Sequence, residues 1–131
     1  AEAQPGSIKL LKHLQARGCR MGVVTRNNHS NLRESLKRCE MESFFDPECL
    51  VSRDQPPAKP SPVPLNRLLQ QWGASPKDGV MVGDAIYDLQ AGRAAGMATI
   101  YLDSSDHGGM DELADLRVCS WTEFLKLSNL S

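Results

Sequence analysis

The stretch Gly79-Val80-Met81-Val82-Gly83-Asp84-Ala85-Ile86-Tyr87-Asp88 decides the fold. Its three consecutive apolar residues lie between two glycines and predict a short, fully buried strand. Gly83 allows the backbone to turn tightly as it leaves the sheet, so Asp84 follows at the carboxyl end of that strand. Helical spacing begins at Ile86 and predicts a helix that ends at Gly96.

Asp84 and Asp88 are four positions apart and form the first candidate site. If Asp84 begins the first helical turn, both carboxylates open on the same side. Two carboxylates that lie so close repel each other unless a cation lies between them, and hard oxygen ligands suit Mg²⁺. The alternative interpretation is a capped helix start followed by one solvated acid.

Length and charge exclude several classes of protein. A chain of 131 residues is long enough for one hydrophobic core, and we expect a single domain over residues 1–131. The 15 basic and 16 acidic residues leave a net charge of -1, which gives no electrostatic reason to expect binding to nucleic acid or to an anionic membrane. No apolar run reaches the length of a membrane span, and no signal segment opens the chain.

The four cysteines are far apart in the sequence: Cys19, Cys39, Cys49 and Cys119. None belongs to a Cys-x-x-Cys pair, so zinc binding is not favoured. The pattern favours free thiols in the cytoplasm or in another reducing compartment.

Helical and strand patterns alternate along the chain. Such alternation predicts an α/β fold, a Rossmann-like three-layer sandwich with a mostly parallel sheet and helices on both faces. The expected strands are 21–25, 49–52, 80–83, 98–102 and 118–119; the expected helices are 7–17, 30–39, 61–72, 86–95 and one that opens with a capping box at 120–123.

Three different polar groups follow the first three predicted strands. Thr25 ends the first, Lys59 lies in the proline-rich loop after the second, and Asp84 ends the third. Because parallel sheets bind ligands at the carboxyl ends of their strands, we expect these groups to gather there. The Thr25 hydroxyl and the backbone N–H groups of Arg26 and Asn27 are suited to an oxyanion.

An ammonium, a hydroxyl and a magnesium site together describe a pocket for a phosphoryl group. Each feature also has a simpler interpretation, because a strand often ends in threonine and a loop lysine is often only solvated. The order of the three features in the chain is what favours the phosphoryl pocket.

These residues also resemble a known family. Val23-Val24-Thr25, Lys59-Pro60-Ser61-Pro62 and the segment 82–97 are similar to motifs II, III and IV of the haloacid dehalogenase (HAD) superfamily, closest to its phosphoglycolate-phosphatase-like branch. The resemblance implies Mg²⁺-dependent hydrolysis of a small phosphate monoester. It implies that Thr25 binds the phosphoryl oxygens and that Asp84 ligates Mg²⁺. It further implies that Lys59 neutralises the charge of nucleophile and phosphate, and that Asp88 supports the metal through water or holds Lys59.

The first motif of that superfamily, Asp-x-Asp, occurs nowhere in the sequence. In the family its first aspartate attacks phosphorus and its second acts as general acid and base. Asp103 and Asp106 are the nearest imitation, but their spacing is wrong. The helical cap between motifs I and II is missing too, and with it the means of reading the substrate. The chain therefore resembles the C-terminal portion of such an enzyme, and we expect weak magnesium binding and no turnover by the chain alone.

The missing motif lies on a strand that in the family separates the strands ending at Thr25 and Gly83. We expect these two strands to pair directly, because pairing satisfies buried backbone groups. Otherwise a partner chain or an upstream segment, for which the start at Ala1 leaves room, completes the sheet. The alternative function is a non-catalytic phosphate-binding or protein-interaction module derived from a HAD phosphatase.

Overall fold

The computed structural model describes residues 5–128, which form two compact units. The first unit combines residues 5–56 with residues 120–128, and the second spans Pro57–Cys119. The expectation of a single domain stays a prediction. The start of the chain, Ala1–Gln4, lies outside the described residues.

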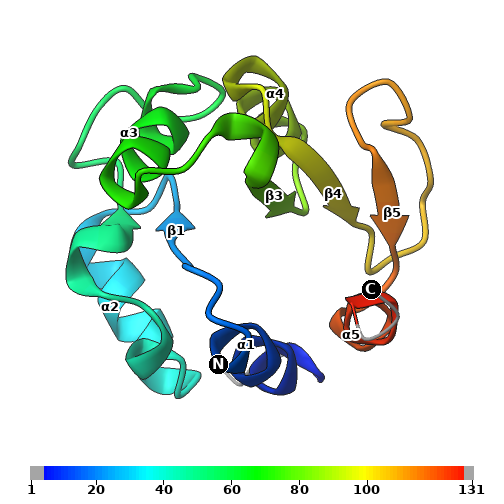
Figure 1. Cartoon of the computed structure of the whole chain (residues 1–131), viewed down its shortest axis with the longest axis horizontal. Helices are drawn as coiled ribbons and strands as arrows, with labels where there is room; N and C mark the ends of the chain where they lie inside the picture. The colour runs from blue at the N-terminus through cyan, green and yellow to red at the C-terminus, as the bar shows by residue number, and fades with distance from the viewer. Residues whose placement is uncertain (1–4, 129–131) are drawn as a thin grey trace. The chain divides into compact units, whose positions relative to one another are not determined.

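The second unit contains a three-stranded parallel sheet in the order β3-β4-β5 (Figure 1). Its strands are β3 (Val80–Gly83), β4 (Ala98–Leu102) and β5 (Leu116–Val118). The bounds predicted for β3 and β4 are confirmed, whereas β5 begins and ends earlier than the predicted 118–119. Since all three strands run in the same direction, their carboxyl ends lie at the same end of the sheet.

Two helices of this unit end where local chemistry predicts. They are α3 (Val63–Trp72) and α4 (Ile86–Ala95), and the chain between them forms a short 3₁₀ turn, η3 (Pro76–Asp78), and then strand β3. Gly73 and Gly96 follow them with φ of 65° and 81°, a left-handed conformation that glycine adopts without strain.

The start of α3 differs slightly from the prediction, which placed the cap at Ser61. Pro62 is the capping residue, and the Ser61 hydroxyl accepts a hydrogen bond from the Val63 N–H at 3.2 Å. Pro64 also fits in this first turn, because the N–H groups there have no partner within the helix.

Close packing of α4 against the sheet depends on Gly92. A Cβ atom at this position would lie 2.6 Å from Thr99 Cγ2 and 2.9 Å from Met81 Cβ. The backbone of α4 therefore lies close to β3 and β4, and Leu89 and Ala91 are completely buried.

The prediction that β3 is fully buried is wrong. Met81 is buried, but Val80 is 52% exposed, and Val82 and Gly83 are half-buried. The reason is that β3 is an edge strand, paired only with β4 in the described part of the chain. An apolar run indicates burial on both faces only for a strand that has neighbours on both sides.

The first unit contains a two-stranded parallel sheet, β1 (Val23–Val24) with β2 (Leu50–Val51). Its helices are α1 (Ser7–Ala16), α2 (His29–Arg38) and α5 (Trp121–Ser128), with 3₁₀ turns η1 (Glu42–Phe44) and η2 (Pro47–Cys49). The predicted inward face of α2 is confirmed, because Leu32 and Leu36 are buried together with Leu50, and Phe45 packs against this cluster.

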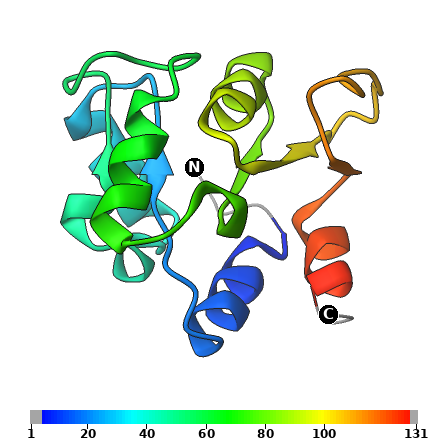
Figure 2. The same cartoon turned by 45° about the horizontal axis from the view of Figure 1, so that its top comes forward.

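The two ends of the first unit meet where α1 packs against α5 (Figure 2). Gly6 makes the contact close, since a Cβ atom there would lie 2.6 Å from Thr122 Oγ1 and 2.9 Å from the Thr122 backbone nitrogen. The predicted cap of α5 is confirmed in part, because the Glu123 N–H donates to Ser120 Oγ at 3.1 Å.

Direct pairing of β1 with β3 was expected, and this prediction is wrong. Within residues 5–128 the strands form two separate sheets, and β1 pairs with β2 alone. The predicted strand 21–25 has only two residues of regular pairing, which Gly22 helps to explain because glycine weakens strands. The architecture is α/β with parallel strands, as predicted. None of the described helices has the length and apolar character needed to cross a membrane.

Candidate active site

The centre of the candidate site is a buried ion pair between Lys59 and Asp88. The Lys59 ammonium donates to Asp88 Oδ1, and the two side chains are only 10% and 9% exposed. The other carboxylate oxygen of Asp88, Oδ2, accepts a hydrogen bond from the Ala85 N–H at 3.2 Å. Asp88 therefore holds the lysine of the proline-rich loop against the start of α4.

Gly83 makes room for this ion pair. A Cβ atom at Gly83 would lie 2.2 Å from Asp88 Cβ and 2.4 Å from Asp88 Oδ2. The sequence predicts that Gly83 allows a tight turn, but its second role, as the space that Asp88 occupies, was missed. No local pattern indicates that role, because it depends on how the first turn of α4 folds back over the end of β3.

Asp84 differs from Asp88 although both follow the same strand. It is exposed, and no side chain or amide within residues 5–128 donates a hydrogen bond to its carboxylate. It follows Gly83, which is paired with Tyr101 of β4. Asp84 therefore offers an unengaged carboxylate at the carboxyl edge of the sheet.

The donor set fits Mg²⁺ in part. Asp84 supplies one hard oxygen ligand, but Asp88 is engaged by Lys59, and the described residues contain no cluster of three or more metal-ligating side chains. Mg²⁺ usually keeps several waters and takes only one or two carboxylates in phosphate sites. The second role considered for Asp88, holding Lys59, agrees with this geometry, and its role as a metal ligand stays a prediction.

The predicted oxyanion site lies in the first unit. Thr25 Oγ1 accepts a hydrogen bond from the Asn27 N–H at 3.1 Å, and the Thr25 N–H donates to Val51 at 2.9 Å. Asn27 also accepts a hydrogen bond from the Arg53 N–H at 3.0 Å through its carbonyl. The loop that carries Thr25, Arg26 and Asn27 is thus fixed to the segment after β2. That these residues share a site with Lys59 and Asp84 stays a prediction.

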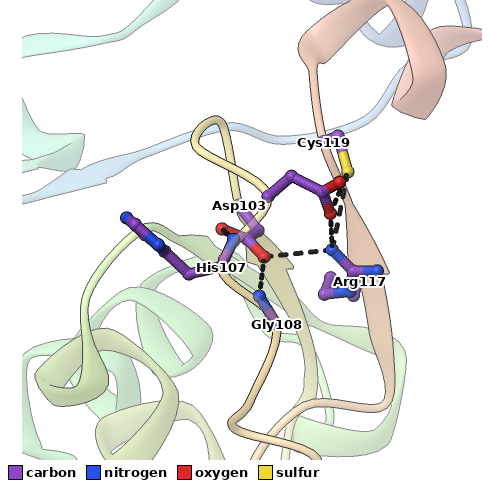
Figure 3. A network of polar contacts seen from close by, with 6 residues as sticks. Asp103, His107, Gly108, Arg117 and Cys119 are labelled. Carbon is purple, nitrogen blue, oxygen red and sulfur yellow. Dashed lines mark hydrogen bonds and ion pairs between the residues drawn. The ribbon is translucent and has the colours of Figure 1, made fainter.

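A second polar network lies at the carboxyl ends of β4 and β5 (Figure 3). The Asp103 side chain is only 1% exposed, and it accepts the N–H groups of His107 at 3.0 Å and Gly108 at 2.7 Å. Arg117 Nη1 donates to the same carboxylate at 3.0 Å and to Asp106 Oδ1 at 2.7 Å. The network ties the loop 103–109 to β5.

The electrostatics of this network favour its charged form. Burial alone would raise the pKa of Asp103, but the Gly108 and His107 amides and the Arg117 guanidinium outweigh burial and lower it. Hydrogen bonds to Asp106 and Asp103 raise the pKa of Arg117. The pKa of Tyr101 is raised by burial first, then by the charge of Asp103 and a hydrogen bond with it, and also by the charge of Asp84.

Sequence reasoning does not select Asp103 and Asp106 as site residues, because they do not match the Asp-x-Asp spacing. A usable signal was nevertheless present. A carboxylate directly after a buried strand, followed by Gly108 and Gly109, is typical of a loop whose free amides turn back onto a side chain.

Comparisons with known proteins identify the class of protein. The sequence profile of the haloacid dehalogenase-like hydrolases matches residues 1–102. The pyrophosphatase PpaX of Bacillus pumilus is 39% identical over 93 residues, which cover 70% of this chain and 42% of that protein. The phosphoglycolate phosphatase of Nitrosospira multiformis is 37% identical over 95 residues, which cover 72% of this chain and 41% of that protein.

The fold is shared with solved members of the same class. The crystal structure of a HAD phosphatase from Thermococcus onnurineus superposes with a TM-score of 0.84 at 25% identity, covering 95% of this chain and 57% of that one. The chain belongs to the haloacid dehalogenase-like hydrolase family and has its Rossmann-like α/β fold. It spans about two fifths of the length of the curated relatives named here.

Proposed function

We propose that this chain supplies the charge-balancing and metal-binding portion of a HAD-type phosphatase that hydrolyses a small phosphate monoester with Mg²⁺. The observation that carries the proposal is the buried Lys59–Asp88 pair beside the free carboxylate of Asp84. Its phosphatase relatives support the reaction class.

Lys59 serves as a fixed positive charge in this proposal. Asp88 and the Ala85 N–H hold the ion pair where water is largely excluded, and a positive charge acts on a phosphoryl group more strongly there than in bulk solvent. Mg²⁺ bound at Asp84 would offset the negative charge of the phosphoryl oxygens. Thr25 and the N–H groups of Arg26 and Asn27 would bind the phosphoryl oxygens, as the family resemblance implies.

The attacking aspartate of the family has no counterpart among these residues, because the sequence contains no Asp-x-Asp. We therefore expect it to bind phosphate and Mg²⁺ weakly without turning over a substrate. Within the described residues 5–128 one side of β3 is unpaired and Val80 is exposed, which supports completion of the sheet by a further strand. We propose that this strand carries the attacking aspartate and comes from an upstream segment or a partner chain.

Binding of inorganic phosphate by the chain tests this proposal, with isothermal titration in the presence and absence of Mg²⁺. Asp84→Asn should lower the Mg²⁺-dependent affinity for phosphate by about tenfold or more, because it removes the unengaged carboxylate at the carboxyl end of β3. Asp78→Asn is the matched control, since Asp78 is an exposed acid that precedes the same strand. An equal effect of the two substitutions contradicts the proposed site.

Catalysis is tested in parallel with 4-nitrophenyl phosphate and Mg²⁺. We expect no release of nitrophenol by the chain, and release once a strand with Asp-x-Asp is supplied. Robust turnover by the chain alone would show that a nucleophile other than the family aspartate is present.

A further inference from the structure

The loop 103–109 begins next to Asp84. Gly83 is paired with Tyr101, so Asp84 lies level with the residue before Asp103 on the neighbouring strand. Neighbouring strands are about 4.8 Å apart, and ligands of parallel sheets bind at this edge. The negative charge of Asp84 contributes to the raised pKa of Tyr101, which agrees with this closeness. The loop is therefore placed to touch whatever binds at Asp84.

The backbone of this loop is unusual and is held from inside. Asp106 and Met110 have φ of 52° and 61°, and Gly108 and Gly109 have φ of 74° and 83°. Glycine adopts such angles without strain, but other residues rarely do, so the angles of Asp106 and Met110 persist only where surrounding contacts hold the backbone. The buried Asp103 carboxylate holds the backbone after Asp106 by accepting the next two amides, and Arg117 contacts that carboxylate.

The surface that the loop presents is polar. Ser104, Ser105 and His107 are exposed, whereas Asp103 is buried within the network. Figure 3 shows the imidazole of His107 directed away from Arg117, so this side chain takes no part in the network. Hydroxyl and imidazole groups are suited to hydrogen bonds with the hydroxyl or carboxylate groups of a small ligand.

We infer that the loop 103–109 is the wall of the phosphate site that contacts the organic part of the substrate, and that Asp103 and Arg117 are its positioning residues. The substrate class that this wall selects is a small phosphate monoester with a polar organic group. This inference rests on the proposed function, since it assigns a specificity loop to the same site.

The chain offers a matched control for Arg117. Arg93 pairs with Asp115 at 3.0 Å and is 40% exposed, against 3.0 Å and 39% for the pair of Arg117 with Asp103. The pair of Arg93 and Asp115 lies at the amino ends of β4 and β5, whereas the pair of Arg117 and Asp103 lies near their carboxyl ends. At the amino ends Asp115 also accepts a hydrogen bond from the Thr99 N–H. The two arginines are thus alike in contact and exposure but differ in their distance from Asp84.

The experiment compares the affinities of three probes in the presence of Mg²⁺: inorganic phosphate, glycerol 2-phosphate and phenyl phosphate. The wild type should bind glycerol 2-phosphate about tenfold more tightly than phenyl phosphate, which is the size of effect that one or two hydrogen bonds give. Arg117→Gln should remove this preference and leave the affinity for inorganic phosphate unchanged. Arg117→Lys should restore part of it, because a single nitrogen of Arg117 makes both carboxylate contacts.

Arg93→Gln should keep the preference even where it lowers thermal stability as much as Arg117→Gln. An equal loss of preference in both variants, or a preference that survives Arg117→Gln, overturns the inference. Binding of inorganic phosphate with no preference between the two esters in the wild type overturns this inference alone. Failure of the wild type to bind inorganic phosphate overturns the proposed function and this inference with it.

Discussion

Each end of the β4–β5 strand pair carries an ion pair between an aspartate and an arginine, but the two ion pairs stabilise different kinds of segment. At each end an aspartate accepts at least one backbone amide and pairs with an arginine at 3.0 Å. At the amino end Asp115 is 45% exposed, and it accepts the N–H of Thr99, a residue of regular strand. At the carboxyl end Asp103 is 1% exposed, and its amides come from an irregular loop.

The contacts at the amino end connect regular elements to each other, whereas those at the carboxyl end determine the conformation of an exposed loop. At the amino end Arg93 Nε also donates to the Leu113 carbonyl at 3.0 Å, and the Thr99 hydroxyl donates to the same carbonyl. These bonds join α4 and β4 to the turn before β5. Helix α4 already packs against β4, and β4 already pairs with β5, so the bonds reinforce contacts that exist without them. At the carboxyl end, burial of a whole carboxylate fixes a loop that no regular structure holds.

The largest loss of stability is expected when the buried ion pair between Lys59 and Asp88, near the carboxyl end of β3, is broken. Lys59→Met leaves the Asp88 carboxylate buried with a single amide donor and should lower the free energy of unfolding by about 3 kcal/mol. Urea denaturation measures this value. The control is Arg38→Met, which breaks the exposed Arg38–Glu34 pair and should cost about 0.5 kcal/mol or less. If the two variants lose equal stability, the Lys59–Asp88 pair is solvated and the contrast fails.

The next effect separates the site from the packing beneath it. Gly83→Ala and Gly92→Ala each place a methyl group within 2.6 Å of a neighbouring atom, and each should cost about 1–3 kcal/mol of unfolding free energy. Only Gly83→Ala displaces Asp88, so only this variant should also weaken phosphate binding at temperatures where both variants are folded. Calorimetric titration with phosphate measures that difference, and parallel losses in both variants would mean that Gly83 acts through packing alone.

The smallest effect concerns acid stability. The pKa values of Asp103 and Asp115 are both below the ordinary 3.8, so the unfolded chain takes up their protons first and stability falls as the pH drops through 3.8 and below. Asp103→Asn and Asp115→Asn should each flatten the fall in melting temperature between about pH 5 and pH 2.

Hydrogen exchange then separates the two ends of the strands. Asp103→Asn should speed exchange of the His107 and Gly108 amides, whereas Asp115→Asn should affect the Thr99 amide. If Asp115→Asn exposed the loop amides as well, the two ends would be coupled and could not serve as independent controls.

The sequence predicts those parts of the molecule whose causes are local. The bounds of β4 and α4 follow from an apolar run and from the glycine that ends the helix, and both agree with the structure. Lys59 and Asp88 were selected because of their positions in two motifs, and one of the two roles considered for Asp88, holding Lys59, matches the observed contact.

The rest depends on contacts between distant segments. Nothing near Val80 in the sequence indicates that β3 is an edge strand, because exposure depends on which strands pair. The space that Gly83 leaves for Asp88, and the burial of Asp103 under Arg117, likewise arise only when the elements assemble. The prediction that β1 pairs directly with β3 is wrong for the same reason.

The division of the chain into units has a consequence for its synthesis. The second unit is one uninterrupted segment, Pro57–Cys119, whereas the first needs α5 to return to α1 across more than a hundred residues. As the ribosome releases the chain from its amino end, the inner segment is complete while α1 still lacks its partner. Helix α5 therefore closes the first unit only after the second unit has emerged, and a chain shortened before Trp121 would leave the contact surface of Gly6 uncovered.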